Sequence, residues 1–257
     1  MTPLGGSLGG PLRGKVALIT GSGSGMGQAH AVLMAERGAE VVVHDLNAAG
    51  AEETAERVRA VGGKPLVFTA DVTDIGVMAA VVRQVEAELG RLDILVNNAG
   101  IGQHRAIEEI TEADFDRMFD VHVKGTFFTT QAIVPGMKQR RYGKIVNISS
   151  IWGVVGAPTA SHYCAAKAAL LGFTKAWAKE LAPYNIHVNA VAPGGVLTPM
   201  PIKVQGMEKI REKEKKVPLG RWATPEEIAY TVAFLASPEA DFITGQVVSP
   251  NGGETIY

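Results

Sequence analysis

The sequence lacks the features that mark several large classes of protein. Only one of its 257 residues is a cysteine, Cys164, so an internal disulfide and a cysteine-based structural zinc site are both excluded. The six histidines form no His-x-x-x-His pair, and we expect no metal site. No apolar run reaches the roughly 18–20 residues that a membrane-spanning helix needs, and the first residues lack the cationic start of a signal peptide. These absences favour a soluble, cytoplasmic protein.

The chain also lacks an excess of charge of either sign. Its 25 Lys and Arg residues offset its 26 Asp and Glu residues, which gives a formal net charge of −1 with neutral histidines. Such a chain has no overall attraction to nucleic acid or to an anionic membrane, so the expected partner is a small-molecule substrate. Hydrophobic residues make up 46% of the chain, which is enough for one large core and argues against disorder.

Short apolar runs alternate with longer amphipathic stretches. Several of these runs are apolar throughout, as a parallel sheet covered on both faces requires. The alternation predicts a single-domain α/β protein with a Rossmann fold, in which a doubly wound parallel sheet of about seven strands carries helices on both faces. The expected strands are residues 15–20, 40–44, 65–70, 92–96, 144–148, 186–192 and 246–249. The expected helices are residues 26–37, 48–61, 73–89, 111–139, 160–181 and 225–235.

A glycine cluster separates the first expected strand from the first expected helix. Gly21, Gly25 and Gly27 allow a tight turn, close approach of a pyrophosphate and close packing of the helix, and Ser24 and Met26 lie between them. The free N–H groups at the start of the helix favour an anion. We therefore expect a dinucleotide site here, within one domain over residues 14–257 that follows a flexible tail over residues 1–13.

The end of the second expected strand indicates which dinucleotide binds. Asp45 lies roughly 20 residues beyond the glycines, where a carboxylate accepts hydrogen bonds from the adenosine ribose. Such a carboxylate repels a 2′-phosphate, and neither Leu46 nor its neighbours supply a fixed cation. The expected cofactor is NAD⁺/NADH.

A tyrosine and a lysine are spaced to share one helix face. Tyr163 and Lys167 lie four residues apart in an expected helix, so a lysine ammonium near the phenol is expected to lower its pKa. Ser150 follows the fifth expected strand and Asn98 follows the fourth. Because ligands of open parallel sheets bind beyond the carboxyl ends of the strands, these residues and the glycine loop are expected to border one crevice.

Taken together, these motifs resemble those of the short-chain dehydrogenase/reductase family, over essentially all of residues 14–257. The matching residues are Thr20-Gly-x-x-x-Gly-x-Gly27, Asp71-Val72, Asn97-Asn98-Ala99-Gly100, Ser150, Tyr163-x-x-x-Lys167, Pro193-Gly194 and Thr198. The resemblance implies that Tyr163 is the general acid/base, that Lys167 lowers its pKa and holds the nicotinamide ribose, and that Ser150 binds the substrate carbonyl. The further cofactor-binding residues that it implies are Asp71, Val72, Asn98, Gly100, Val196 and Thr198.

The sequence departs from the family pattern at one position. Where the family often has an asparagine that holds a water chain leading to the lysine, this chain has His122. Histidine also binds water and titrates near pH 7, so His122 either serves in the proton relay or only packs.

The resemblance also implies a substrate lid over residues 198–220 and a homo-oligomer, either a tetramer or a dimer. Expected substrate contacts are Ile151, Trp152, Gln103 and Met200, and His104 is a further candidate. The charged run at residues 208–216 is interpreted as a solvated helix face, with recognition of a phosphate on a carrier-bound substrate as the alternative.

These expectations lead to one main hypothesis and two alternatives. The main hypothesis is an NAD(H)-dependent oxidoreductase that interconverts a secondary alcohol and a ketone by hydride transfer. The first alternative is a 3-oxoacyl-thioester reductase acting on an acyl carrier protein or CoA substrate. The second is a nucleotide-binding regulator without turnover, which the presence of both Tyr163 and Lys167 disfavours.

Overall fold

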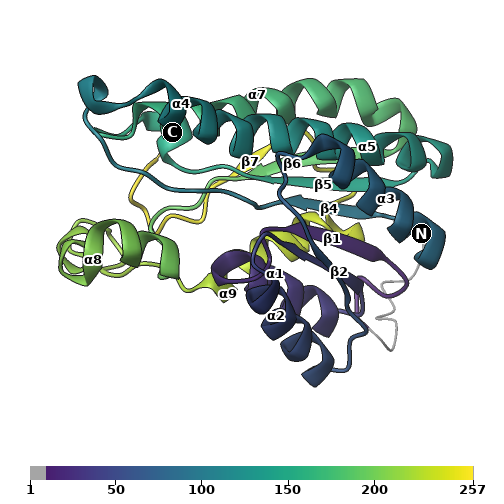
Figure 1. Ribbon diagram of the computed structural model, residues 1–257. Coiled ribbons are helices and arrows are strands. Elements are labelled where there is room, and N and C mark those ends of the chain that lie inside the picture. Colours follow the sequence, from purple (N-terminus) through teal and green to yellow (C-terminus); the bar gives the residue numbers. More distant parts are fainter. Residues whose placement is uncertain (1–9, 257) are drawn as a thin grey trace.

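A seven-stranded parallel sheet forms the centre of the protein in a computed structural model, which describes residues 10–256 (Figure 1). The strand order is β3-β2-β1-β4-β5-β6-β7, and every paired strand runs parallel to its neighbour. The strands are β1 (Val16–Thr20), β2 (Glu40–Asp45), β3 (Leu66–Thr69), β4 (Ile94–Asn97), β5 (Gly143–Ile148), β6 (Ile186–Val191) and β7 (Val247–Val248). The predicted doubly wound sheet is confirmed.

Helices cover both faces of this sheet (Figure 1). One face carries α1 (Gly25–Glu36), α2 (Ala48–Ala60) and α9 (Pro225–Leu235). The other carries α3 (Ile75–Leu89), α4 (Glu112–Phe119), α5 (Gly125–Arg140) and α7 (Ser161–Leu181). A short helix α6 (Trp152–Val155) follows β5, and α8 (Pro199–Glu214) follows β6 and stands away from the sheet. Three 3₁₀ turns complete the helices, at Ile107–Glu109, Ala182–Tyr184 and Pro238–Ala240.

The apolar strands explain this layering. Every residue of β1, β4 and β5 is buried, so both faces of the central strands need a cover of helices. Two separate hydrophobic clusters fill the layers, one under α1 and α9 and one under α3, α5 and α7. The strand order reverses between β1 and β4, which opens the crevice in which open α/β sheets bind ligands.

The predicted long helix at residues 111–139 is interrupted in the structure. A π-helical turn, Asp120–Lys124, joins α4 to α5. Short π-helical turns hold one extra residue and are frequent at functional sites. The π-helical turn carries His122, one of the candidate catalytic residues.

The folded part of the chain begins earlier than residue 14. Leu12 is fully buried in the core, and its N–H donates to the carbonyl of Arg37 at 3.0 Å. The expectation of a flexible tail is therefore wrong for residues 10–13, because the apolar Leu12 has a core site to fill. The rest of that expected tail, residues 1–9, lies outside the described residues. In the described part of the chain, no helix is both long enough and apolar enough to span a membrane.

Candidate active site

In the glycine loop, the backbone at Gly21 passes very close to Gly27 in the first turn of α1. A side chain at Gly27 would place its Cβ 2.2 Å from the carbonyl oxygen of Gly21, so no larger residue fits there. Asn98 fixes the same loop, because its side-chain amide donates to the carbonyls of Thr20 and Gly21 at 2.9 and 2.8 Å. The sequence placed Asn98 beside the cofactor. In the structure it holds the glycine loop in place.

The N-terminus of α1 is left open for an anion. Its N-cap residue, Ser24, makes no side-chain cap hydrogen bond, and the first turn contains no acidic residue. By contrast, a side chain caps the N-terminus of α2, α3, α4 and α9. The starts of α5, α6, α7 and α8 also lack a side-chain cap, but α1 is the helix that follows the glycine loop, so its first N–H groups are the candidates for binding a pyrophosphate.

Asp45 lies at the end of β2, directly against the glycine loop. Its carboxylate accepts hydrogen bonds from the N–H of Gly23 at 2.7 Å and from the N–H of Asn47 at 2.8 Å. The next residue, Leu46, is 59% exposed and adds no charge. A negative charge therefore borders the loop where an adenosine ribose is expected.

Asp71 and Val72 follow β3 at the same edge of the sheet. Burial opposes the ionisation of Asp71, but hydrogen bonds from the N–H and hydroxyl of Thr73, together with the Arg117 guanidinium at 3.3 Å, lower its pKa. Val72 is buried in a small cluster with Met78 and Val121. Arg117 is a partner of Asp71 that the sequence did not indicate.

His122 occupies a buried position beside the tyrosine. Its Nε2 lies 2.8 Å from the carbonyl oxygen of Ile101 and 3.1 Å from the N–H of that residue. The ring fits because position 100 is glycine, since a Cβ there would lie 2.5 Å from the His122 ring. Burial, and then the nearby Lys167, lower the pKa of His122 well below its usual value. The His122 ring meets the Tyr163 ring edge-on, with centroids 5.5 Å apart.

Ser150, Tyr163 and Lys167 come together as predicted, but their charges differ from the expectation. Lys167 is buried, and its Nζ donates to the carbonyl of Ile148 at 2.8 Å. Burial lowers the pKa of this lysine to about 7. Burial also raises the pKa of Tyr163 to about 12, against the effect of a hydrogen bond with Ser150.

Contrary to the expectation, Lys167 therefore does not lower the pKa of Tyr163 in this structure. The ammonium lies 5.7 Å from the phenol ring centroid, and it is bonded to the backbone. Loss of hydration disfavours the charged forms of both groups, so the pKa of each shifts in the direction that favours its neutral form.

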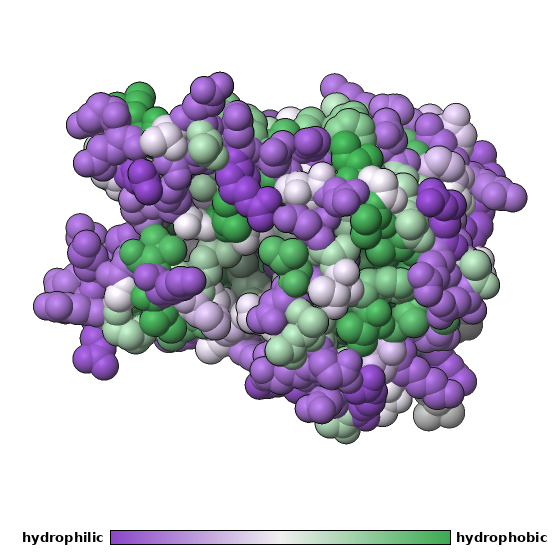
Figure 2. All heavy atoms as spheres, in the orientation of Figure 1, coloured by the Kyte–Doolittle hydropathy of each residue, from purple (hydrophilic) through white to green (hydrophobic). Residues whose placement is uncertain are grey.

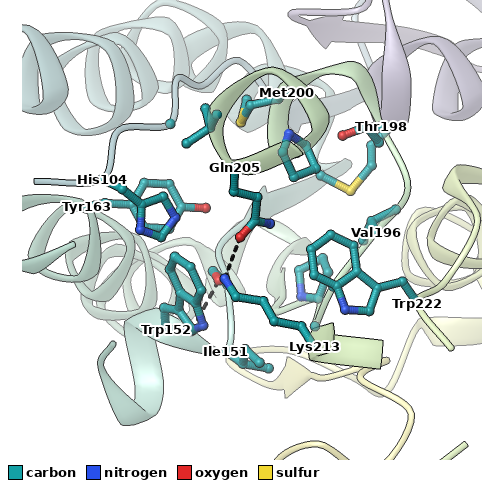
Figure 3. A pocket seen from close by; sticks show the side chains of 18 of the residues that line it. His104, Ile151, Trp152, Tyr163, Val196, Thr198, Met200, Gln205, Lys213 and Trp222 are labelled. Atoms are coloured by element: carbon teal, nitrogen blue, oxygen red, sulfur yellow. Dashed lines mark hydrogen bonds between the residues drawn. The ribbon is translucent and has the colours of Figure 1, made fainter. Parts of the chain in front are cut away.

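A pocket opens beside these residues, between α8 and the carboxyl edge of the sheet (Figure 2). Ser150, Tyr163, Trp152 and Met200 line it, as do the cofactor candidates Val196 and Thr198 (Figure 3). The walls of this pocket thus bring together residues that the sequence assigned to catalysis, to the substrate and to the cofactor.

The other predicted substrate residues, Gln103, Ile151 and the candidate His104, also line the pocket, and each has further contacts within the protein. Gln103 reaches the pocket, but its amide is occupied, because it donates to Asp114 at 2.6 Å and lies 2.7 Å from Nε2 of His162. Ile151 also lines the pocket but is almost fully buried. His104 stands edge-on to Trp152, with ring centroids 5.2 Å apart.

Sequence reasoning missed two side chains that α8 and the turn after it bring to the pocket. Lys213 belongs to a charged run that was interpreted as a solvated face, yet it lines the pocket. Trp222 also lines it, and its ring lies where a side chain at Gly195 would otherwise sit. No sequence signal distinguishes Lys213, because it has the same charged neighbours as the exposed lysines around it. Among residues 10–256, no group of three histidine, cysteine or acidic side chains is placed to hold a metal ion.

The chain is similar to known proteins along nearly its whole length. A family model described as enoyl-(acyl carrier protein) reductase matches residues 21–255. A 3-oxoacyl-[acyl-carrier-protein] reductase of Thermotoga maritima is 44% identical over 246 residues, covering 95% of this chain and 99% of the relative. A cyclopentanol dehydrogenase of Comamonas sp. is 40% identical over 247 residues, covering 96% and 99%. The crystal structure of levodione reductase superposes with a TM-score of 0.92 at 33% identity, covering 96% of this chain and 100% of that chain.

These relatives are named as dehydrogenases and reductases, and they match the chain along nearly its whole length. The glycine loop and the Ser150, Tyr163 and Lys167 cluster lie within the residues that the family model matches, 21–255. The protein is an oxidoreductase that acts on CH–OH groups and their carbonyl counterparts, and the chain belongs to the short-chain dehydrogenase/reductase family.

Proposed function

We propose that this protein interconverts a secondary alcohol and a ketone with NAD⁺/NADH as the cofactor. The observation that carries the proposal is the shared pocket, in which Ser150 and Tyr163 face Val196 and Thr198 beside the uncapped start of α1. Residues proposed to bind the cofactor and residues proposed to react with the substrate thus lie along one continuous pocket.

The residues present fit a nicotinamide dinucleotide. The open N-terminus of α1 would hold the pyrophosphate, Asp45 the adenosine ribose, and Asp71 and Val72 would border the adenine. Val196 and Thr198 would hold the carboxamide. When bound, the cofactor supplies or accepts the hydride.

The side chains of the protein manage the proton. With a pKa raised to about 12, Tyr163 is a neutral phenol at physiological pH, ready to donate its proton to the oxygen of a ketone. Ser150 would hydrogen-bond the same oxygen and stabilise the negative charge that develops there. In the oxidative direction the phenolate is needed, and a Lys167 ammonium that turns from Ile148 toward the phenol would stabilise it.

The preference for NAD⁺/NADH rests on Asp45. A carboxylate fixed against Gly23 would repel a 2′-phosphate, and the exposed Leu46 offers no cation in its place.

Reduction of a 3-oxoacyl thioester is the second candidate function. It is favoured by the Thermotoga maritima relative, whose name describes that reaction. Acetoacetyl-CoA with either NADH or NADPH tests it directly, alongside 2-pentanol and cyclopentanol with NAD⁺.

The Tyr163→Phe variant tests the proposed chemistry. We expect it to lose more than about a hundredfold in kcat, because proton transfer typically contributes 10²- to 10⁴-fold, while calorimetric NADH affinity stays within about twofold. Tyr230→Phe, an exposed tyrosine on α9, is the matched control and should keep full activity. Undiminished turnover in Tyr163→Phe would contradict the mechanism, and failure of the unmodified protein to bind NADH would contradict the assigned cofactor.

A further inference from the structure

A lysine ammonium lies inside the candidate substrate pocket. Lys213 projects from α8, and its Nζ donates to the side-chain oxygen of Gln205 at 2.5 Å (Figure 3). The same Nζ lies 5.3 Å from the centroid of the Trp152 ring, which is close enough for a cation–π contact. A neutral amide and an aromatic face are therefore its near neighbours.

This ammonium has no anionic partner in the described part of the chain. No carboxylate of residues 10–256 lies within ion-pair distance of Lys213. Directly after this helix, the exposed Lys215 is paired with Glu212 at 2.6 Å. Lys203 and Lys209 of α8 form no ion pair with a described residue either, but both are exposed and can rely on water, whereas Lys213 is partly buried.

The charged groups around Lys213 favour an anionic ligand beside it. Burial lowers its pKa, Glu254 across the pocket acts in the opposite direction, and Lys209 and Lys216 lower it further. Burial, and then Lys213 and Lys209, lower the pKa of His104, whose ring meets the Trp152 ring edge-on. A partly buried cation that lacks a counter-ion is unfavourable, and a ligand carrying an anion would supply one.

The distances place this anion close to the reacting carbon. The Trp152 ring lies 5.3 Å from the Lys213 ammonium and 6.0 Å from the Tyr163 ring. Because both distances are measured to the Trp152 ring, the Lys213 ammonium and the Tyr163 ring are at most about 11 Å apart, a span that a ligand with a few carbon atoms between its carbonyl and its anion can bridge. The phosphate of a carrier-bound thioester is separated from the reacting carbonyl by many more bonds, so this geometry fits a carboxylate on the substrate itself.

We propose that Lys213 and Gln205 form a carboxylate-binding subsite, and that the substrate is a short-chain hydroxy acid or its oxo acid. This inference rests on the proposed alcohol–ketone chemistry, and it names the substrate class of the same site. Lys213 acts as a specificity-determining residue, and Tyr163 keeps its role at the carbonyl.

Binding in a dead-end complex tests the subsite without turnover. NAD⁺ and a ketone are both oxidised and cannot react, so calorimetry can measure 3-oxobutanoate, 4-oxopentanoate and 5-oxohexanoate against their uncharged amides. We expect at least one acid to bind about tenfold or more tightly than its amide, as a charged hydrogen bond predicts. Lys213→Met should remove this preference and Lys213→Arg should keep most of it, while Lys215→Met should leave it unchanged.

The same titrations without NAD⁺ separate the two proposals. If NAD⁺ binds and 2-pentanol is oxidised but no acid is preferred over its amide, the subsite is wrong and the proposed function stands. If the cofactor does not bind, the proposed function is wrong, and acid preference in the cofactor-free protein still decides the subsite. An acid preference that survives in a folded Lys213→Met protein also overturns the inference.

Discussion

At the scale of single residues, the site is held mainly by bonds between polar side chains and the backbone. Lys167 donates to the carbonyl of Ile148, Asp45 accepts from the N–H of Gly23, and Asn98 donates to Thr20 and Gly21. Asp45 and Asn98 are held in position in this way before any ligand arrives, whereas Lys167 would exchange its bond to Ile148 when it turns toward the phenol, so substitutions here should change affinity and selectivity more than the fold.

Exchange of Asp45 for serine, together with Leu46→Arg, should reverse the cofactor preference. Loss of the carboxylate removes the repulsion of a 2′-phosphate, and the new arginine at the exposed position supplies a cation. We expect NADH affinity to fall about tenfold and NADPH affinity to rise by at least as much, measured by calorimetric titration. Asp116→Ser, at an exposed position on α4, is the control and should change neither affinity.

Retained preference for NADH in the double variant would show that Asp45 does not select the cofactor. In that event its bonds to Gly23 and Asn47 would be structural only.

The sequence predicted which residue types meet at this site, but not their protonation states or their backbone partners. Tyr163 and Lys167 were expected to form a pair with a lowered tyrosine pKa, because their spacing puts them on one helix face. The spacing does not reveal how far either residue is buried. Burial instead raises the pKa of Tyr163, and Lys167 donates to the carbonyl of Ile148. Lys213 was missed for a related reason, since it is partly buried although most of the charged residues around it in sequence are exposed.

At the scale of helices and strands, sequence patterns were most informative where burial is complete. The expected strand at residues 15–20 and helix at residues 225–235 agree with β1 and α9 to within a residue. Local pattern was weakest at α8, where Pro199, Pro201 and Gly206 interrupt any periodicity. The hydrophobic pattern also did not predict the π-helical turn. One extra residue barely alters the helical period of apolar residues over a single turn.

Two glycine substitutions should distinguish the effect of the α8 kink on substrate binding from the general effect of a glycine on helix stability. Gly206 has φ +80° and ψ 158° inside α8, a conformation that other residues rarely adopt, so Gly206→Ala should straighten or strain the helix. We expect the Michaelis constant for substrate to rise several-fold, because Gln205 and Lys213 lie on opposite sides of the kink, while NADH affinity is unchanged.

Gly172→Ala, in α7, is the matched control. It adds a methyl group with no atom within 4 Å, and it should raise the unfolding free energy by about 0.5–1 kcal/mol without changing the Michaelis constant. Urea denaturation and steady-state kinetics on both variants check the pair. Equal Michaelis constants in both would exclude a role for the kink in binding.

At the scale of the whole molecule, two hydrophobic layers enclose a sheet that also carries buried polar groups. Asn97 donates to Asn147 at 2.8 Å, and Asn147 donates to Thr174 on α7 at 2.9 Å, so hydrogen bonds join β4, β5 and α7 through the core. Lys167 is buried against the same layer. Its charge state therefore affects global stability.

Stability should rise with pH through the range in which Lys167 loses its proton. The folded pKa of this lysine is about 7, below its usual 10.5, so between these values the unfolded chain binds more protons than the folded one. Its contribution is fully present above 10.5 and is lost as pH falls toward 7. Tyr163 acts only at higher pH, since its raised pKa of about 12 favours the folded state until pH exceeds 10.

Lys167→Met removes this dependence and so provides the measurement. We expect the unfolding free energy of the unmodified protein, relative to that of Lys167→Met, to increase by about 1 kcal/mol per pH unit between about pH 7.5 and 9.5 in urea denaturation. Lys175→Met, at an exposed position on α7, should follow the unmodified protein. Parallel curves for all three proteins would mean that Lys167 stays charged when folded.

The π-helical turn at Asp120–Lys124 has a consequence for insertions and deletions. Because the turn holds one residue more than an α-helical turn, deleting a single residue within it would let α4 and α5 join as one regular helix. The residues before the deletion would then rotate by about 100° relative to those after it. His122 would leave its place beside Tyr163, so the length of the chain at this point, as well as the identity of the residue, determines what faces the catalytic tyrosine.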